Sequence, residues 1–263
     1  ALAGRPWQAR RMLHALLRGK RPGGAVPDPR DREDAGPLDV DLLARREDPL
    51  TASVFERLAY LPGGLSAAIV LAASKPLGED PAVEPALPAG RPTWTFWPSL
   101  RPGEGAHHRQ RVEPDLVVAW DAAVWVFEVK HRGVQRTGQW VEQIRAVHSD
   151  RRWKGRGVTF FAVGGLRPED DSSRSSGVRA AFGAQAPALR RLSWAALHSE
   201  VDRQLSSLEG HEGIAAVLRD VGAALDLWDH RLPLGLGSLR EEAGRFRRRR
   251  ADAARVLEDW GKR

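Results

Sequence analysis

The chain has 263 residues, of which 42% are hydrophobic and 29% charged, so it can form a core of domain size. It has no cysteine, which excludes disulfides, thiolate metal sites and cysteine nucleophiles. No apolar stretch approaches the length of a membrane span and no secretory signal is evident, so we expect a cytoplasmic protein without a membrane partner. The net charge of +7 favours a polyanionic partner, although the codon usage of a GC-rich genome explains an arginine-rich composition equally well.

The elements predicted from residue patterns, in chain order, favour an α/β fold. Apolar residues at helical spacing predict the first helix, β-prone runs predict three strands, and a second helix and a short apolar strand follow. The order is therefore α-β-β-β-α-β, which predicts a mixed central sheet flanked by helices. The corresponding ranges are 41–60, 93–100, 112–120, 123–131, 137–147 and 158–163.

Composition divides the chain into three regions. Residues 1–37 begin with a basic helix candidate and continue into a Gly-, Pro- and charge-rich linker. Residues 38–200 contain the α/β pattern. Residues 201–263 are predicted to be a basic helical extension, with a helix at 239–260 that carries Arg247–Arg250.

Two predicted strands form a hairpin that brings two carboxylates together. Only Asp121 and Ala122 separate the strands, so Asp115, six residues before this turn, lies almost opposite Glu128, six residues after it. Lys130 is two residues beyond Glu128 and therefore points to the same face. Facing carboxylates within apolar strands are costly unless a cation lies between them, and such hard oxygen ligands suit Mg²⁺ or Mn²⁺.

The residues E-P-D-L-V-V and V-F-E-V-K-H, in this order of elements, resemble the PD-(D/E)XK nuclease superfamily, which has the restriction-endonuclease-like fold. The resemblance covers roughly residues 40–165. It implies that Asp115, Glu128 and the Val129 carbonyl hold the metal, and that Lys130 orients the attacking water or helps to deprotonate it. The implied reaction is the hydrolysis of DNA phosphodiester bonds, with a role in restriction or defence against mobile elements.

The resemblance also suggests outer members of the site. An acidic residue on the first helix often completes it, and helical spacing favours Glu47, placed on the core side, over Glu56, placed on the solvent side. Glu47 has an alternative role as a first-turn acid that complements the helix dipole. On the second helix Gln143 is the candidate, although Val147 stands where related branches have an aromatic residue, and a surface polar pair with Gln139 explains it equally well.

Basic residues after the motif are candidates for nucleic-acid contacts, although each is individually an ordinary solvated cation. The alternative functions are an RNA-directed nuclease and a non-catalytic nucleic-acid-binding module of the same fold. No sequence-reading motif is evident, so sequence specificity is either absent or supplied by a partner or another domain, and a homodimer or a partner subunit is a candidate arrangement. The basic candidates are Arg132, Arg136, Arg145, Arg151, Arg152 and Lys154.

Overall fold

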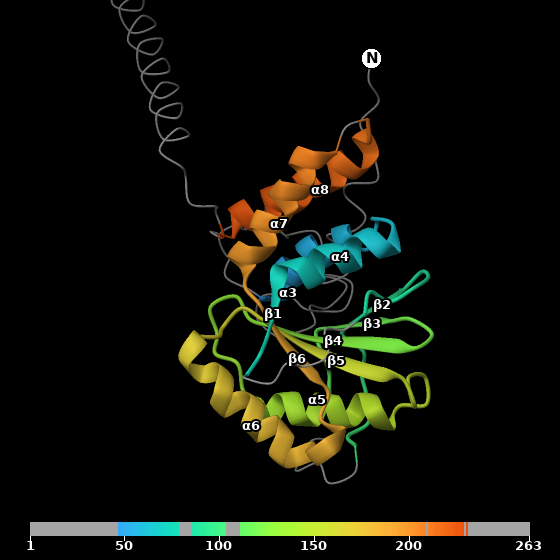
Figure 1. Ribbon diagram of the computed structural model, residues 1–263, viewed down its shortest axis with the longest axis vertical. Coiled ribbons are helices and arrows are strands. Elements are labelled where there is room, and N and C mark those ends of the chain that lie inside the picture. The colour runs from blue at the N-terminus through green and yellow to red at the C-terminus, as the bar shows by residue number, and fades with distance from the viewer. Residues whose placement is uncertain (1–46, 79–85, 104–110, 209, 229, 231–263) are drawn as a thin grey trace, which may run out of the picture. The chain divides into compact units, whose positions relative to one another are not determined.

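The computed structural model describes residues 47–78, 86–103, 111–208, 210–228 and 230. The predicted N-terminal extension and the predicted helix at 239–260 lie outside these residues. Within them, the protein is an α/β structure with a six-stranded mixed sheet and six α-helices (Figure 1).

The sheet has the strand order β1-β6-β5-β4-β3-β2. Its parallel centre consists of β4, β5 and β6, and the remaining neighbours pair antiparallel. Buried apolar residues follow one another along the central strands, as expected for a sheet covered on both faces. The strands are β1 (Ser74–Pro76), β2 (Thr93–Phe96), β3 (Leu116–Ala119), β4 (Ala123–Val129), β5 (Gly157–Val163) and β6 (Ala188–Leu192).

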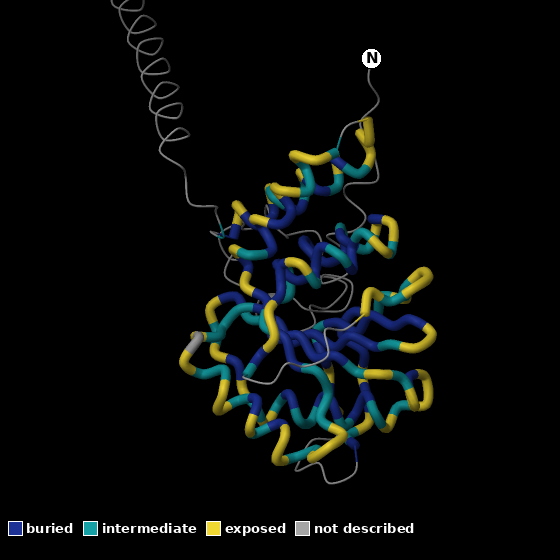
Figure 2. Tube along the Cα trace, viewed as in Figure 1, coloured by how far each residue is buried: buried dark blue, intermediate teal, exposed yellow. Residues whose placement is uncertain are grey.

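Helices cover both faces of this sheet and form two hydrophobic cores (Figures 1 and 2). One core lies between the sheet and the helices α3 (Glu47–Thr51), α4 (Gly63–Ala73), α7 (Trp194–Ser207) and α8 (Glu212–Leu227). The other lies under α5 (Thr137–Ser149) and α6 (Asp171–Phe182). Side chains alternate along β4, so Trp125 and Phe127 face the first core, and Val124 and Val126 face the second.

The hairpin prediction is confirmed. Val118 pairs with Trp125 and Ala119 with Val124, and the Trp120 N–H donates to the Ala123 carbonyl at 2.8 Å. The turn therefore consists of Asp121 and Ala122.

Several elements were not predicted because their sequences lack the expected contrast between faces. Helix α4 is apolar nearly all round, because it packs between the sheet and α7. Helix α6 is rich in serine and contains a glycine, a composition typical of loops. Strand β6 contains the buried Arg190, whose guanidinium donates to the Ser74 hydroxyl and carbonyl next to it in β1.

The first predicted helix contains a π-helical turn, η2 (Ala52–Glu56), and this corrects the prediction for Glu56. Glu56 was expected to face solvent but is 8% exposed. A wider turn rotates later residues relative to regular 100° steps, and α8 packs against η2.

The predicted domain boundary after residue 200 falls inside α7 and does not separate compact units. The described residues up to His230 form one unit, because the apolar faces of α7 and α8 bury residues such as Leu197 and Leu218 in the core shared with α4. No helix among the described residues combines the length and the apolar character needed to cross a membrane.

Candidate active site

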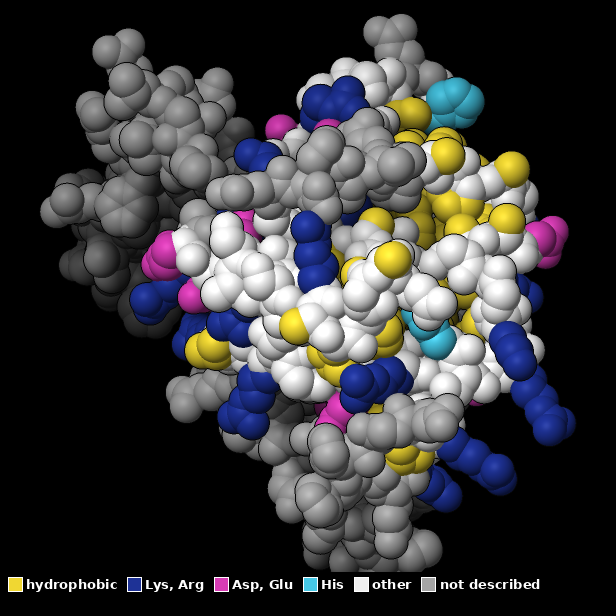
Figure 3. Space-filling model, turned by 60° about the horizontal axis from the view of Figure 1, so that its bottom comes forward, with side chains coloured by type: hydrophobic (Ala, Val, Ile, Leu, Met, Phe, Trp, Pro, Cys, Tyr) yellow, Lys and Arg dark blue, Asp and Glu magenta, His cyan; other side chains and the backbone are white. Residues whose placement is uncertain are grey.

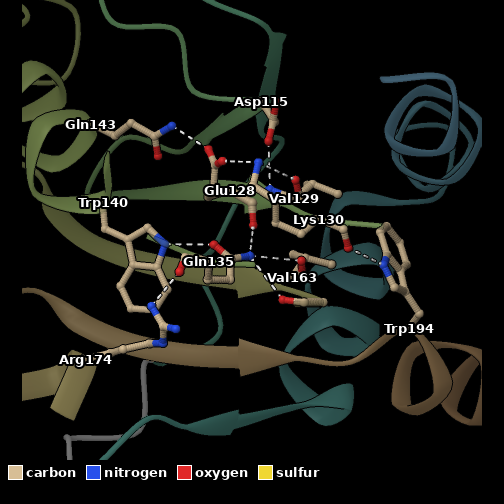
Figure 4. A network of polar contacts seen from close by, with 11 residues as sticks. Asp115, Glu128, Val129, Lys130, Gln135, Trp140, Gln143, Val163, Arg174 and Trp194 are labelled. Carbon is tan, nitrogen blue, oxygen red and sulfur yellow. Dashed lines mark hydrogen bonds and ion pairs between the residues drawn. The ribbon is translucent and has the colours of Figure 1, made fainter. Parts of the chain in front are cut away.

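Asp115 lies where β3 begins and is held against the end of β4. Continuing the register from the pair of Leu116 and Phe127 by one residue places Asp115 level with Glu128. The Val129 N–H donates to Asp115 Oδ2 at 2.7 Å (Figure 4). On the other side of Asp115, the Trp97 N–H donates to its carbonyl at 3.1 Å, and Trp97 has a left-handed backbone with φ of 45°. Backbone strain of this kind, in a tryptophan that is 1% exposed, is typical of functional sites.

Glu128 receives donors from two directions. Lys130 Nζ lies 2.6 Å from Glu128 Oε1, and Gln143 Nε2 donates to Glu128 Oε2 at 2.6 Å (Figure 4). Glu128 and Gln143 are each 1% exposed, so Gln143 is not part of a surface polar pair. The structure thus brings together Asp115, Glu128, Lys130 and Gln143 on the sheet face that α5 covers.

The carboxylates influence each other electrostatically. Burial is the main cause that raises the pKa of Asp115 well above its ordinary value of 3.8, and the Glu128 carboxylate raises it further. The Val129 N–H and the Lys130 ammonium act in the opposite direction but do not offset these effects. A cation bound beside Asp115 would act in the same direction as Lys130 and favour the ionised form of the Asp115 carboxyl.

The donor chemistry fits a hard divalent cation. Mg²⁺ commonly binds through one or two carboxylates and keeps several waters. Asp115, Glu128 and the Val129 carbonyl therefore supply the types of oxygen ligand that a Mg²⁺ site needs. Lys130 Nζ donates to the Val129 carbonyl at 3.2 Å as well as contacting Glu128. Its ammonium thus already contacts two of the three predicted ligand groups, which shows that they converge on a positive charge. The described residues contain no cluster of three or more His, Asp or Glu side chains arranged to hold a metal.

Two residues that the sequence did not suggest hold the end of β4. Gln135 is 1% exposed, and its amide nitrogen donates to the carbonyls of Glu128, Val163 and Gly164, each at 3.1 Å. Its amide oxygen accepts from Trp140 Nε1 at 2.8 Å. From the opposite helical layer, Trp194 Nε1 donates to the Lys130 carbonyl at 2.9 Å (Figure 4). A lone glutamine in a loop and one of ten tryptophans carry no sequence signal for such roles.

In the first helix, Asp48 is the acidic residue whose described side chain lies near Asp115. Glu47 begins α3, but its side chain lies outside the described part of the structure. Asp48 is half-buried and close enough to Asp115 to contribute to the raised pKa of that carboxyl.

The predicted basic cluster is divided between the two ends of the sheet. Arg132 and Arg136 are exposed in the loop that follows the motif. The turn after α5 instead lies beside the hairpin, where the Gly157 N–H donates to the Ala122 carbonyl at 3.0 Å. This end is roughly 17 Å from Glu128 along β4, so a single phosphate path at the motif does not include the turn residues. Those residues are Arg151, Arg152 and Lys154.

Two of the predicted arginines have structural partners. Arg152 forms a bidentate pair with Asp150, with Nε and Nη2 donating at 2.9 and 2.8 Å, and it stacks on Trp153 at 4.3 Å. Arg145, half-buried on α5, lies over the Phe182 ring at 5.7 Å.

Comparison of the chain with protein-family models, with curated proteins and with solved structures gives no match. The functional interpretation therefore depends on the motif and on the geometry of the site.

Proposed function

We propose that this chain is a Mg²⁺- or Mn²⁺-dependent endonuclease of the PD-(D/E)XK type that hydrolyses DNA phosphodiester bonds, on a restriction-endonuclease-like core. The observation that carries the proposal is the convergence of Asp115, Glu128, Lys130 and Gln143 at one end of β4. Two carboxylates that face each other, one of them 1% exposed, are electrostatically costly, and burial and Glu128 both raise the pKa of Asp115.

Each residue has a distinct role in this proposal. Asp115, Glu128 and the Val129 carbonyl would hold the metal, which lowers the pKa of a bound water and stabilises charge on the scissile phosphate. Gln143 keeps Glu128 Oε2 hydrogen-bonded and so orients the carboxylate. Lys130, whose ammonium reaches Glu128 Oε1, would orient the attacking water or help to remove its proton.

A cleavage assay tests the proposal. The protein is incubated with plasmid, linear duplex DNA, single-stranded DNA or RNA in Mg²⁺, Mn²⁺ or EDTA. Lys130→Ala and Glu128→Ala are expected to lower the cleavage rate at least about 100-fold. The matched controls Lys154→Ala and Glu212→Ala change exposed residues of the same types and are expected to cleave like the wild type. Circular dichroism checks that every variant is folded.

The outcomes separate the alternatives. Cleavage in EDTA, or full activity in folded Lys130→Ala and Glu128→Ala proteins, would overturn the nuclease proposal. Preferred cleavage of RNA would keep the chemistry and change the substrate. Binding of DNA without cleavage under any metal condition would favour the non-catalytic module.

A further inference from the structure

A row of register partners extends from the candidate active site across the sheet. Glu128 in β4 pairs with Ala162 in β5, Ala162 pairs with Arg191 in β6, and Arg191 pairs with Lys75 in β1. Register partners share a face of the sheet, so Arg191 and Lys75 lie on the same face as Glu128 and Asp115. Neighbouring strands are about 4.8 Å apart, which places the backbones of Arg191 and Lys75 roughly 10 and 14 Å from that of Glu128.

A cavity lies along this row beyond the active site. Its volume is about 190 Å³, and its lining includes Lys75, Ala162, Gly164, Arg191 and Ser193. Within the row, the small side chain of Ala162 lies between Glu128 and Arg191. One water occupies about 30 Å³ in the liquid, so the cavity has room for a phosphate group with some of its hydration. The first turn of α7, which also borders the cavity, adds N–H groups of the kind that favour anions.

The described charged groups at the cavity are two cations and one carboxylate. Lys75 and Arg191 are directly opposite in an antiparallel pair, where like charges destabilise the sheet. Asp171 Oδ2 lies 3.3 Å from Arg191 Nε and offsets one positive charge. Lys75 is exposed, and its ammonium has no ion pair with the described part of the chain.

Lys and Arg side chains on the face visible in Figure 3 are spread out and do not gather into one patch. Lys75 and Arg191 are distinguished by their position, because both line this cavity and both lie in the row that contains Glu128.

We propose that Lys75 and Arg191 form a phosphate subsite that binds the nucleic-acid backbone next to the scissile bond. This inference rests on the proposed function, because it assigns the subsite to the same substrate. It positions the substrate and takes no part in bond cleavage, since it does not reach the reacting atoms.

Binding without metal tests the subsite separately from catalysis. Fluorescence anisotropy measures the affinity of a fluorescein-labelled DNA duplex in EDTA over a series of salt concentrations. Lys75→Gln is expected to lower the slope of log K against log salt by about 0.9, the value for one lost phosphate contact. Lys154→Gln removes the same charge at the opposite end of the sheet and serves as the matched control. Arg191→Ala is a second variant, with its folding checked by thermal unfolding.

Steady-state cleavage gives the second measurement. Lys75→Gln is expected to raise KM roughly fivefold or less and to leave kcat unchanged, because the lost contact is present in both ground and transition states. A loss of affinity in Lys75→Gln and not in Lys154→Gln would support the subsite even if the protein cleaves nothing. Equal salt slopes in Lys75→Gln, Lys154→Gln and the wild type would overturn the subsite even if the protein is a nuclease.

Discussion

Replacing Asp115 by asparagine removes one of two facing carboxylates and keeps a similar shape. The amide oxygen of asparagine can still accept the Val129 N–H, which donates to Asp115 Oδ2 at 2.7 Å. The repulsion from Glu128 and the cost of burying the Asp115 charge both disappear. We therefore expect Asp115→Asn to be more stable than the wild type near pH 8 in the absence of metal.

The size and the sign of this effect follow from proton linkage. Because the pKa of Asp115 is raised, the folded protein keeps a proton that the unfolded chain has already released. Wild-type stability therefore falls as the pH rises from about 3.8 to the folded-state pKa, by at most about 1.4 kcal/mol per pH unit. In a unit of this size, a loss of about 1.4 kcal/mol in the free energy of unfolding lowers Tm by roughly 3–6 °C. Below the unfolded pKa the full stability is present.

Thermal unfolding between pH 5 and pH 8 in EDTA, followed by circular dichroism, measures this dependence. The Tm of Asp115→Asn should fall less steeply with pH than that of the wild type. Asp121→Asn, in the exposed hairpin turn at the opposite end of β4, is the matched control and should keep the wild-type slope. Mg²⁺ should reverse the ranking, because saturation at 100 times Kd stabilises the wild type by about 2.7 kcal/mol and the variant by less.

Two results would refute this reasoning. An Asp115→Asn protein that is less stable than the wild type at pH 8 without metal would show that the carboxylate is not electrostatically costly. An identical pH slope in the two proteins would show that Asp115 does not hold a proton over this range.

The remaining predictions concern the two glutamines. Gln143→Leu removes the donor to Glu128 Oε2, so the cleavage rate should fall roughly 10- to 100-fold and recover in part at higher Mg²⁺ concentration. An unchanged cleavage rate and an unchanged Mg²⁺ requirement would contradict this role of Gln143. Gln135→Leu removes the hydrogen-bond partner of the carbonyls at the end of β4 and of the Trp140 N–H. The free energy of unfolding, measured by urea denaturation, should therefore fall by about 2–4 kcal/mol. A loss below about 1 kcal/mol would show that water replaces Gln135.

The part of the site that could be predicted from the sequence is the part that local register determines. The spacing of Asp115 and Glu128 about a two-residue turn gives their proximity without any knowledge of the remaining fold. Lys130 follows from alternation along the same strand. Gln143 could be predicted only from the resemblance to the motif, because helical spacing does not tell whether Gln139 or Gln143 faces the sheet.

Contacts between distant segments could not be predicted in this way. Glu56 is predicted to face solvent when the helix is considered alone, whereas in the structure it is buried in a turn against which α8 packs. Lys154 and its neighbours were assigned to the motif because they follow it in sequence, although α5 runs back along the sheet and carries them to the hairpin end. Sequence distance is a poor measure of position once a helix connects two parallel strands.

The hydrogen bonds that end the strands also determine the rigidity of the site. The last carbonyls of β4 and β5 have no further strand residues to pair with, and buried carbonyls need donors. Gln135, just before α5, supplies donors from one helical layer, and Trp194, at the start of α7, supplies one from the other. The backbone on both sides of Val129 is therefore held from both faces of the sheet, and the predicted metal ligands need little rearrangement before they act. Substitutions that loosen this strand end should accordingly lower activity before they unfold the protein.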